Sequence, residues 1–169
     1  METPEQVRLL VKYAKFPPVG HRGYAPTRDG YWNPGELTAE GITDYMETKN
    51  RETLLLPQCE TLSCLEHLDE IVSIDGVDGV YIGPLDLSIA MGIPLKMEDP
   101  RMQNAIGHIL QTCKKYGKFS AIYCSDTHSA KRYAAMGFDS VTIGLDLSCL
   151  TATYRSIACL LYTSPSPRD

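Results

Sequence analysis

The sequence predicts an α/β fold in which four parallel strands alternate with helices, about half of an eight-stranded TIM barrel. Short apolar segments typical of buried strands alternate with longer segments whose apolar residues recur at helical spacing. Polar residues follow the predicted strands at the end where TIM barrels carry their active sites. No Gly-x-Gly-x-x-Gly motif follows any strand, so a dinucleotide-binding fold is not favoured.

The first predicted element is a helix that begins at Thr3-Pro4, where threonine can cap the helix and proline suits its first turn. It ends at Phe16-Pro17-Pro18. Residues 17–42 contain five glycines and four prolines. This composition predicts a long loop, and a loop of that length in a compact domain is more often functional than not.

The remaining elements follow from changes of hydrophobic period. The apolar segment 53–58 predicts a strand buried on both faces, as in a parallel sheet. We expect helices at 43–50, 62–73, 99–116, 127–136 and from about Asp146, and strands at 53–58, 79–82, 119–123 and 140–143.

The composition excludes several classes of protein. The chain has 169 residues, 43% of them hydrophobic and 22% charged, which is typical of one globular domain. No apolar run approaches the ~18 residues of a membrane-spanning helix, and the first residues do not form a signal peptide. A formal net charge of −5 provides no basic surface for nucleic acid or anionic lipid.

Six cysteines stand at positions 59, 64, 113, 124, 149 and 159, and none of them forms a Cys-x-x-Cys pair. Most lie in apolar segments. We therefore expect reduced, buried thiols and a cytoplasmic protein rather than a disulfide scaffold.

Two acidic residues follow neighbouring strands of the predicted sheet. Gln58 and Glu60 close the first strand, and Asp86 follows the second. Because parallel strands end at one edge of a sheet, both carboxylates should lie at that edge. Two protein oxygens with other positions left open are a usual way to hold a hard divalent cation such as magnesium. The alternative is a solvated acid at each strand end.

The turn at Gly83-Pro84-Leu85-Asp86 provides a second candidate feature. A short helix should begin there, and its free backbone N–H groups can receive a substrate carboxylate. An ordinary strand-to-helix turn with glycine and proline is the alternative.

With these residues assembled, the chain resembles the HpcH/HpaI family of class II pyruvate aldolases. The resemblance spans essentially residues 2–158 and implies the C-terminal half of a TIM barrel. The matching segments, in the family's order and spacing, are Phe16-Pro-Pro-Val-Gly-His-Arg-Gly23, Pro57-Gln-Cys-Glu-Thr61, Leu68-Asp-Glu-Ile71, Gly76-Val-Asp-Gly-Val-Tyr-Ile-Gly-Pro-Leu-Asp-Leu-Ser88 and Ile143-Gly-Leu-Asp146.

The resemblance implies a role for each site residue. Glu60 and Asp86 are similar to the ligands of a divalent metal, which is magnesium, manganese or cobalt. Gln58 matches a glutamine that hydrogen-bonds a bound 2-oxo acid. The backbone at Gly83, Pro84 and Leu85 matches the part that holds the pyruvyl carboxylate. Arg22 is similar to an arginine that helps to receive the aldehyde, on a loop that can serve a neighbouring subunit of a homo-oligomer.

The implied reaction is cleavage of a 4-hydroxy-2-oxo acid into pyruvate and an aldehyde, in which a metal stabilises the enolate. No lysine ends a predicted strand, in agreement with chemistry that needs no Schiff base. The family's base histidine and its stabilising arginine belong upstream of Met1, and His21, His67, His108 and His128 do not replace them. We therefore expect an inactive fragment. The alternatives are a citryl- or malyl-CoA lyase and a non-catalytic fragment.

The last eleven residues, 159–169, match one reading frame of a transposon-end adapter used for sequencing libraries. This match predicts a partial aldolase domain over residues 1–158, an artefactual tail, and a missing natural C-terminus.

Overall fold

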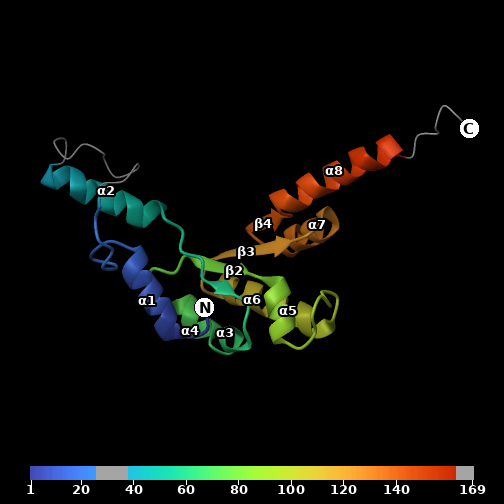
Figure 1. Cartoon of the computed structure of the whole chain (residues 1–169). Coiled ribbons are helices and arrows are strands. Elements are labelled where there is room, and N and C mark those ends of the chain that lie inside the picture. The colour runs from blue at the N-terminus through green and yellow to red at the C-terminus, as the bar shows by residue number, and fades with distance from the viewer. Residues whose placement is uncertain (26–37, 163–169) are drawn as a thin grey trace, which may run out of the picture.

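The computed structural model describes residues 1–25 and 38–162 of the chain. Its centre is a parallel sheet whose four strands lie in the order β1-β2-β3-β4 (Figure 1). This order and direction confirm the α/β prediction. The strands are β1 Gln58–Cys59, β2 Gly79–Ile82, β3 Phe119–Cys124 and β4 Ser140–Ile143.

The described helices follow the predicted order, but the predicted helix 62–73 is two helices and several bounds differ. They are α1 Pro4–Ala14, α2 Ala39–Glu52, α3 Leu62–Glu66, α4 Leu68–Ser73, α5 Pro84–Ala90, α6 Pro100–Lys115, α7 Thr127–Met136 and α8 Asp146–Tyr162.

Two predicted boundaries in the N-terminal region need correction. Helix α2 is longer than the predicted 43–50, because the Thr38 side chain accepts a hydrogen bond from the backbone of Gly41 and starts the helix four residues earlier. The predicted loop therefore ends near Thr38, and its residues 26–37 lie outside the described part of the chain.

The hydrophobic core lies on one face of the sheet. Helices α4 and α6 pack there, and Figure 1 shows α1 and α3 on the same side. Ile82 and Ile122 point into this core from neighbouring strands, together with Ile106 and Ile109 of α6. The alternate strand residues, such as Tyr81 and Phe119, are only half-buried. One face of the sheet is thus packed against helices as in a barrel wall.

The first strand is shorter than predicted, and burial on both faces is wrong for its beginning. Leu54 is 59% exposed, and only Gln58 and Cys59 join the ladder with β2. Pro57 has no backbone N–H and cannot donate to a neighbouring strand. Upstream of it, the backbone N–H of Leu55 donates to the Asp78 side chain at 2.7 Å. The Asp78 side chain therefore accepts a hydrogen bond that a backbone carbonyl of β2 would accept in a continuous strand pair.

The predicted helix 62–73 is divided into α3 and α4 at His67. Its backbone leaves helical geometry, with φ −101° and ψ 13°. Both the backbone N–H and the ring Nδ1 of His67 lie within hydrogen-bond distance of the Ser63 carbonyl, at 3.1 and 2.8 Å. The break turns Leu68, Ile71 and Val72 of α4 into the core.

A buried lysine joins three elements at the amino-terminal edge of the sheet. Lys15 follows α1 and is 3% exposed. Its Nζ donates to the carbonyls of Asn50 and Thr53 and to Asp78 Oδ2 at 3.1 Å. Asn50 in turn binds both the backbone N–H and the carbonyl of Phe16. This Lys15 cluster fixes the end of α1 against α2 and the start of β2.

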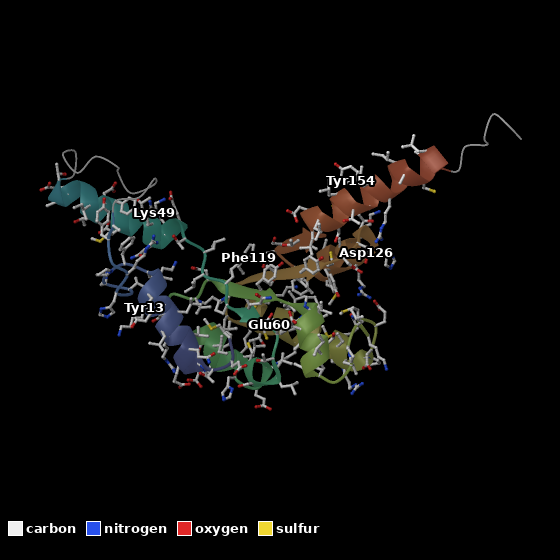
Figure 2. The ribbon with its side chains drawn as sticks, in the orientation of Figure 1. Tyr13, Lys49, Glu60, Phe119, Asp126 and Tyr154 are labelled. Atoms are coloured by element: carbon white, nitrogen blue, oxygen red, sulfur yellow. The ribbon has the colours of Figure 1, made fainter. Side chains whose placement is uncertain are left out.

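Helix α8 projects away from the sheet (Figure 1). Figure 2 labels Tyr154 on this helix, where it is 65% exposed. The helix crosses the predicted 158/159 boundary and continues to Tyr162, so the structure marks no break there. The adapter origin of residues 159–169 stays a prediction, and residues 163–169 lie outside the described part. None of the helices described is long and apolar enough to span a bilayer.

Candidate functional site

The carboxyl edge of the sheet brings Gln58 and Glu60 together around Gly83. Gln58 opens the short strand β1, Glu60 follows that strand, and Gly83 follows its neighbour β2. A Cβ built on Gly83 meets Gln58 Nε2 at 2.7 Å and Glu60 Oε2 at 2.8 Å. Both side chains therefore occupy the space that any residue larger than glycine needs. Figure 2 shows Glu60 in the middle of the molecule, next to the sheet.

Asp86 lies at the same edge, in the first turn of α5 directly after β2. Within residues 1–25 and 38–162, the carboxylates of Glu60 and Asp86 have no hydrogen-bond or ion-pair partner. Like charges at one edge repel unless a proton or a cation intervenes. The donor set, two carboxylates with an adjacent amide, consists of the oxygen ligands that magnesium and manganese prefer. These residues fit a divalent cation.

The number of protein ligands is small. Among the described residues, no group of three or more His, Cys, Asp and Glu side chains is placed to hold a metal. A site with two carboxylates leaves positions open for substrate and water, which is the arrangement common for magnesium.

The backbone around Leu85 lies beside this edge. Helix α5 begins at Pro84 after Gly83, and the first amide that closes a helical turn is that of Leu87, which donates to the Gly83 carbonyl at 3.0 Å. The backbone N–H groups of Leu85 and Asp86 precede it and are not needed for the helix. They are free to bind an anion.

Arg22 is not brought to this edge. Its backbone N–H donates to the Lys15 carbonyl at 2.9 Å, and Lys15 reaches Asp78 at the start of β2. Its guanidinium lies over the Phe16 ring, 4.7 Å from the ring centre. Arg22 therefore lies at the amino-terminal edge of the sheet, whereas Glu60 and Asp86 lie at the carboxyl edge. His21 is next to it and exposed.

Among the described residues, none of the other histidines forms a hydrogen bond or an ion pair with Glu60 or Asp86. His67 stands at the exposed break between α3 and α4, and His108 is exposed on α6. His128 is exposed in the first turn of α7, which is capped by the Asp126 side chain rather than by the histidine. His128 follows the carboxyl end of β3 and so lies at the same edge of the sheet as Glu60, but in the described residues it forms no hydrogen bond or ion pair with either acid.

A cavity of about 340 Å³ adjoins the site and was missed from the sequence. It shares Leu85 with the site and extends between α5 and α7. The only sequence signal was the polar pair Cys124-Ser125 at the end of β3. Its lining is Pro84, Leu85, Leu95, Met97, Tyr123, Cys124, Ser125, Ser129 and Tyr133.

The contact around Gly83 yields a direct prediction. Gly83→Ala should weaken divalent-cation binding at least about tenfold, because the new methyl group displaces Gln58 and Glu60. The backbone φ of −96° at Gly83 accommodates alanine without strain. Isothermal titration with Mn²⁺ measures the effect.

Gly107→Ala is the matched control, since a Cβ there meets no atom within 4 Å. It lies inside α6, where alanine is the better helix former, and it should leave Mn²⁺ binding unchanged. Equal Mn²⁺ affinities of the two variants would show that Gly83 is not part of the site.

Known proteins are similar to this chain over most of its length. The model of the HpcH/HpaI aldolase/citrate lyase family matches residues 1–152. The hydroxypyruvate/pyruvate aldolase of Deinococcus radiodurans is 38% identical over 160 residues, which are 94% of this chain and 55% of that protein. The 4-hydroxy-2-oxo-heptane-1,7-dioate aldolase of Klebsiella pneumoniae is 34% identical, over 94% of this chain and 58% of its own length.

The fold is also that of a solved relative. The crystal structure of an HpcH/HpaI aldolase from Desulfitobacterium hafniense matches 100% of this chain and 64% of its own, with a TM-score of 0.86 at 22% identity. This chain therefore spans little more than half the length of the curated relatives it matches. The chain belongs to the HpcH/HpaI aldolase/citrate lyase family.

Proposed function

We propose that this chain forms the metal- and keto-acid-binding part of a class II aldolase that cleaves a 4-hydroxy-2-oxo acid into pyruvate and an aldehyde. The observation that carries this proposal is the convergence of Gln58 and Glu60 on Gly83, with Asp86 following the neighbouring strand end. The relatives from Deinococcus radiodurans and Klebsiella pneumoniae are named aldolases. That naming favours the aldolase over a citryl- or malyl-CoA lyase.

Each residue of the site has a task in this proposal. Glu60 and Asp86 hold a divalent cation, which is magnesium, manganese or cobalt. When bound, such a cation polarises a substrate carbonyl and stabilises negative charge that develops on its oxygen. Gln58 donates a hydrogen bond from Nε2 to the bound 2-oxo acid, and the backbone N–H groups of Leu85 and Asp86 receive its carboxylate.

Arg22 contacts the substrate of a neighbouring subunit in this proposal. It lies at the opposite sheet edge from Glu60, so it cannot contact a substrate held by the acids of its own chain. We assign it to the aldehyde end of a substrate bound by a neighbouring subunit, which requires a homo-oligomer. The four buried cysteines are all thiols in the structure, which suits a reducing, cytoplasmic location.

The proton transfer belongs to the part of the relatives that this chain does not span. In the part of the chain that the structure describes, no histidine or arginine forms a hydrogen bond or an ion pair with either acid. We therefore assign the base and the residue that stabilises the enolate to the upstream half of the barrel. General acid–base catalysis contributes about 10²–10⁴-fold to such a rate. The 169-residue chain alone should therefore show no measurable aldol cleavage.

The test is reconstitution. The N-terminal half of the Deinococcus radiodurans relative is joined to residues 1–158, and pyruvate release from 4-hydroxy-2-oxo acids is followed with magnesium, manganese and cobalt. Metal-dependent release by the joined protein, and none by the 169-residue chain, is the expected result. Turnover by the chain alone, or turnover after chelation of all metal, would contradict the proposal. Release from citryl- or malyl-CoA alone would favour the lyase alternative.

A further inference from the structure

The Ser88 hydroxyl joins two segments next to the candidate site. Ser88 belongs to α5 and is 0% exposed. Its Oγ donates a hydrogen bond to the Leu85 carbonyl at 2.6 Å and accepts one from the Leu95 backbone N–H at 3.1 Å. One buried hydroxyl therefore connects the first turn of α5 to the loop between α5 and α6.

The bond to Leu85 acts on the backbone that carries Asp86. The Leu85 carbonyl and the Asp86 N–H belong to one planar peptide group, so a bond that orients the carbonyl also orients the chain as it enters Asp86. Helix α5 has only seven residues, and a helix of that length gains little stability from its own backbone bonds. A buried hydrogen bond in its first turn therefore has a large share in fixing this segment.

The bond to Leu95 holds a backbone conformation that leucine disfavours. Leu95 has a φ of 63°, in the left-handed region where a Cβ is crowded. Its side chain is 72% exposed, so packing of the side chain does not hold this conformation. The hydrogen bond to Ser88 does. Such conformations persist where the surrounding structure fixes them, and they are frequent beside ligand sites.

Both partners of Ser88 also line the cavity of about 340 Å³ between α5 and α7, which contains Leu85 and Leu95 in its wall. Because Ser88 binds the backbone of each, it fixes this wall relative to the turn that carries Asp86. The cavity wall and the proposed metal ligand thus depend on the same hydroxyl.

We propose that Ser88 is a positioning residue, whose hydroxyl holds the Asp86 turn and the Leu95 loop in one arrangement and thereby sets both the metal affinity and the shape of the adjoining cavity. Metal–ligand distances tolerate changes of only about 0.2 Å, so a carboxylate on a loosened turn binds a cation less tightly. The effect on metal binding rests on the proposed function, whereas the restraint on Leu95 does not.

Ser88→Ala in the full chain tests the proposal, because it removes both hydrogen bonds and introduces no bulk. Isothermal titration should show Mn²⁺ binding weakened about tenfold, the lower end of the loss expected when an orienting hydrogen bond at a metal site is removed. Amide hydrogen exchange, followed by NMR, should become about tenfold faster at Leu95, because its N–H loses its acceptor. Ser88→Thr retains a hydroxyl that can bind the Leu85 carbonyl, and it should bind Mn²⁺ more tightly than Ser88→Ala.

Ser120→Ala is the matched control for the loss of a buried hydroxyl. Ser120 is 1% exposed near the start of β3, where its Oγ donates to the Asp139 carboxylate at 2.8 Å and accepts from the Asp139 N–H at 3.3 Å. This variant should unfold at a lower urea concentration but keep its Mn²⁺ affinity. Ser73→Ala removes a hydroxyl that donates to the Glu70 carbonyl on α4, and it should change neither the Mn²⁺ affinity nor the exchange at Leu95.

Three results would overturn the inference. They are the same Mn²⁺ affinity for Ser88→Ala and the parent chain, an equal loss of affinity in Ser120→Ala, and unchanged exchange at Leu95 in Ser88→Ala. If the parent chain itself binds no Mn²⁺, the metal site of the proposed function fails, and the exchange at Leu95 decides by itself whether Ser88 holds the loop.

Discussion

Glu60→Gln and Asp86→Asn are each expected to abolish Mn²⁺ binding by the chain and aldol cleavage by the reconstituted protein. Each substitution replaces a charged oxygen ligand with a neutral amide of nearly the same size. A two-carboxylate site cannot lose half of its charge and still hold a hydrated divalent cation at micromolar concentration. Electrostatic stabilisation of a developing oxyanion contributes about 10²–10³-fold to a rate, so activity should fall by at least that factor.

The measurements are isothermal titration with Mn²⁺ and the rate of pyruvate release. Glu66→Gln is the matched control, because Glu66 is an exposed carboxylate on α3, only six residues from Glu60. It should bind Mn²⁺ as the parent chain does. If Glu60→Gln and Glu66→Gln have the same Mn²⁺ affinity and the same activity, Glu60 is not a ligand. Circular dichroism of each variant confirms that the fold is retained.

Lys15→Ala should destabilise the fold more than any of the substitutions at the carboxyl edge of the sheet. Lys15 Nζ is the shared donor to the Asn50 and Thr53 carbonyls and to Asp78. Without it, the Asp78 carboxylate, 33% exposed, loses its cation. Removing one partner of a buried ion pair costs about 3–5 kcal/mol of unfolding free energy. Urea unfolding followed by circular dichroism measures this difference.

Lys12→Ala is the control for the same helix, since Lys12 is an exposed residue of α1. Its effect on the unfolding free energy should stay within about 0.5 kcal/mol. Asp78→Asn should fall between the two variants, because an amide oxygen still accepts from the Leu55 N–H while the charge is lost. Equal unfolding midpoints for Lys12→Ala and Lys15→Ala would show that the Lys15 cluster does not hold this edge together.

Local patterns in the amino-acid sequence were sufficient to predict the order of the helices and strands and the parallel sheet. Apolar periods of two and of about 3.6 residues distinguish strands from helices, and the predicted helix cap Thr3 accepts the expected backbone hydrogen bond. Alternation of the two types implies parallel strands. This geometry alone places Glu60 and Asp86 at one edge, as the structure shows.

Local errors arose where a side chain competes with the backbone for hydrogen bonds. The Asp78 side chain accepts a hydrogen bond from the Leu55 backbone N–H, so β1 is shorter than predicted. His67 divides a segment in which the helical spacing of apolar residues continues unbroken from α3 to α4. Hydrophobic periodicity predicts neither deviation. It shows which face of an element is apolar, but not which backbone groups form hydrogen bonds with side chains.

Only the tertiary structure decided which distant residues meet. A lysine at the end of α1 is expected to face solvent, yet Lys15 is buried because carbonyls from residues 50 and 53 and a carboxylate from residue 78 surround it. The family resemblance predicted an active-site position for Arg22, but its backbone N–H donates to the Lys15 carbonyl and holds it at the opposite edge of the sheet. Sequence patterns thus determined the elements and the ends at which polar residues lie. Contacts between segments far apart in the chain depend on packing in three dimensions, which no local period encodes.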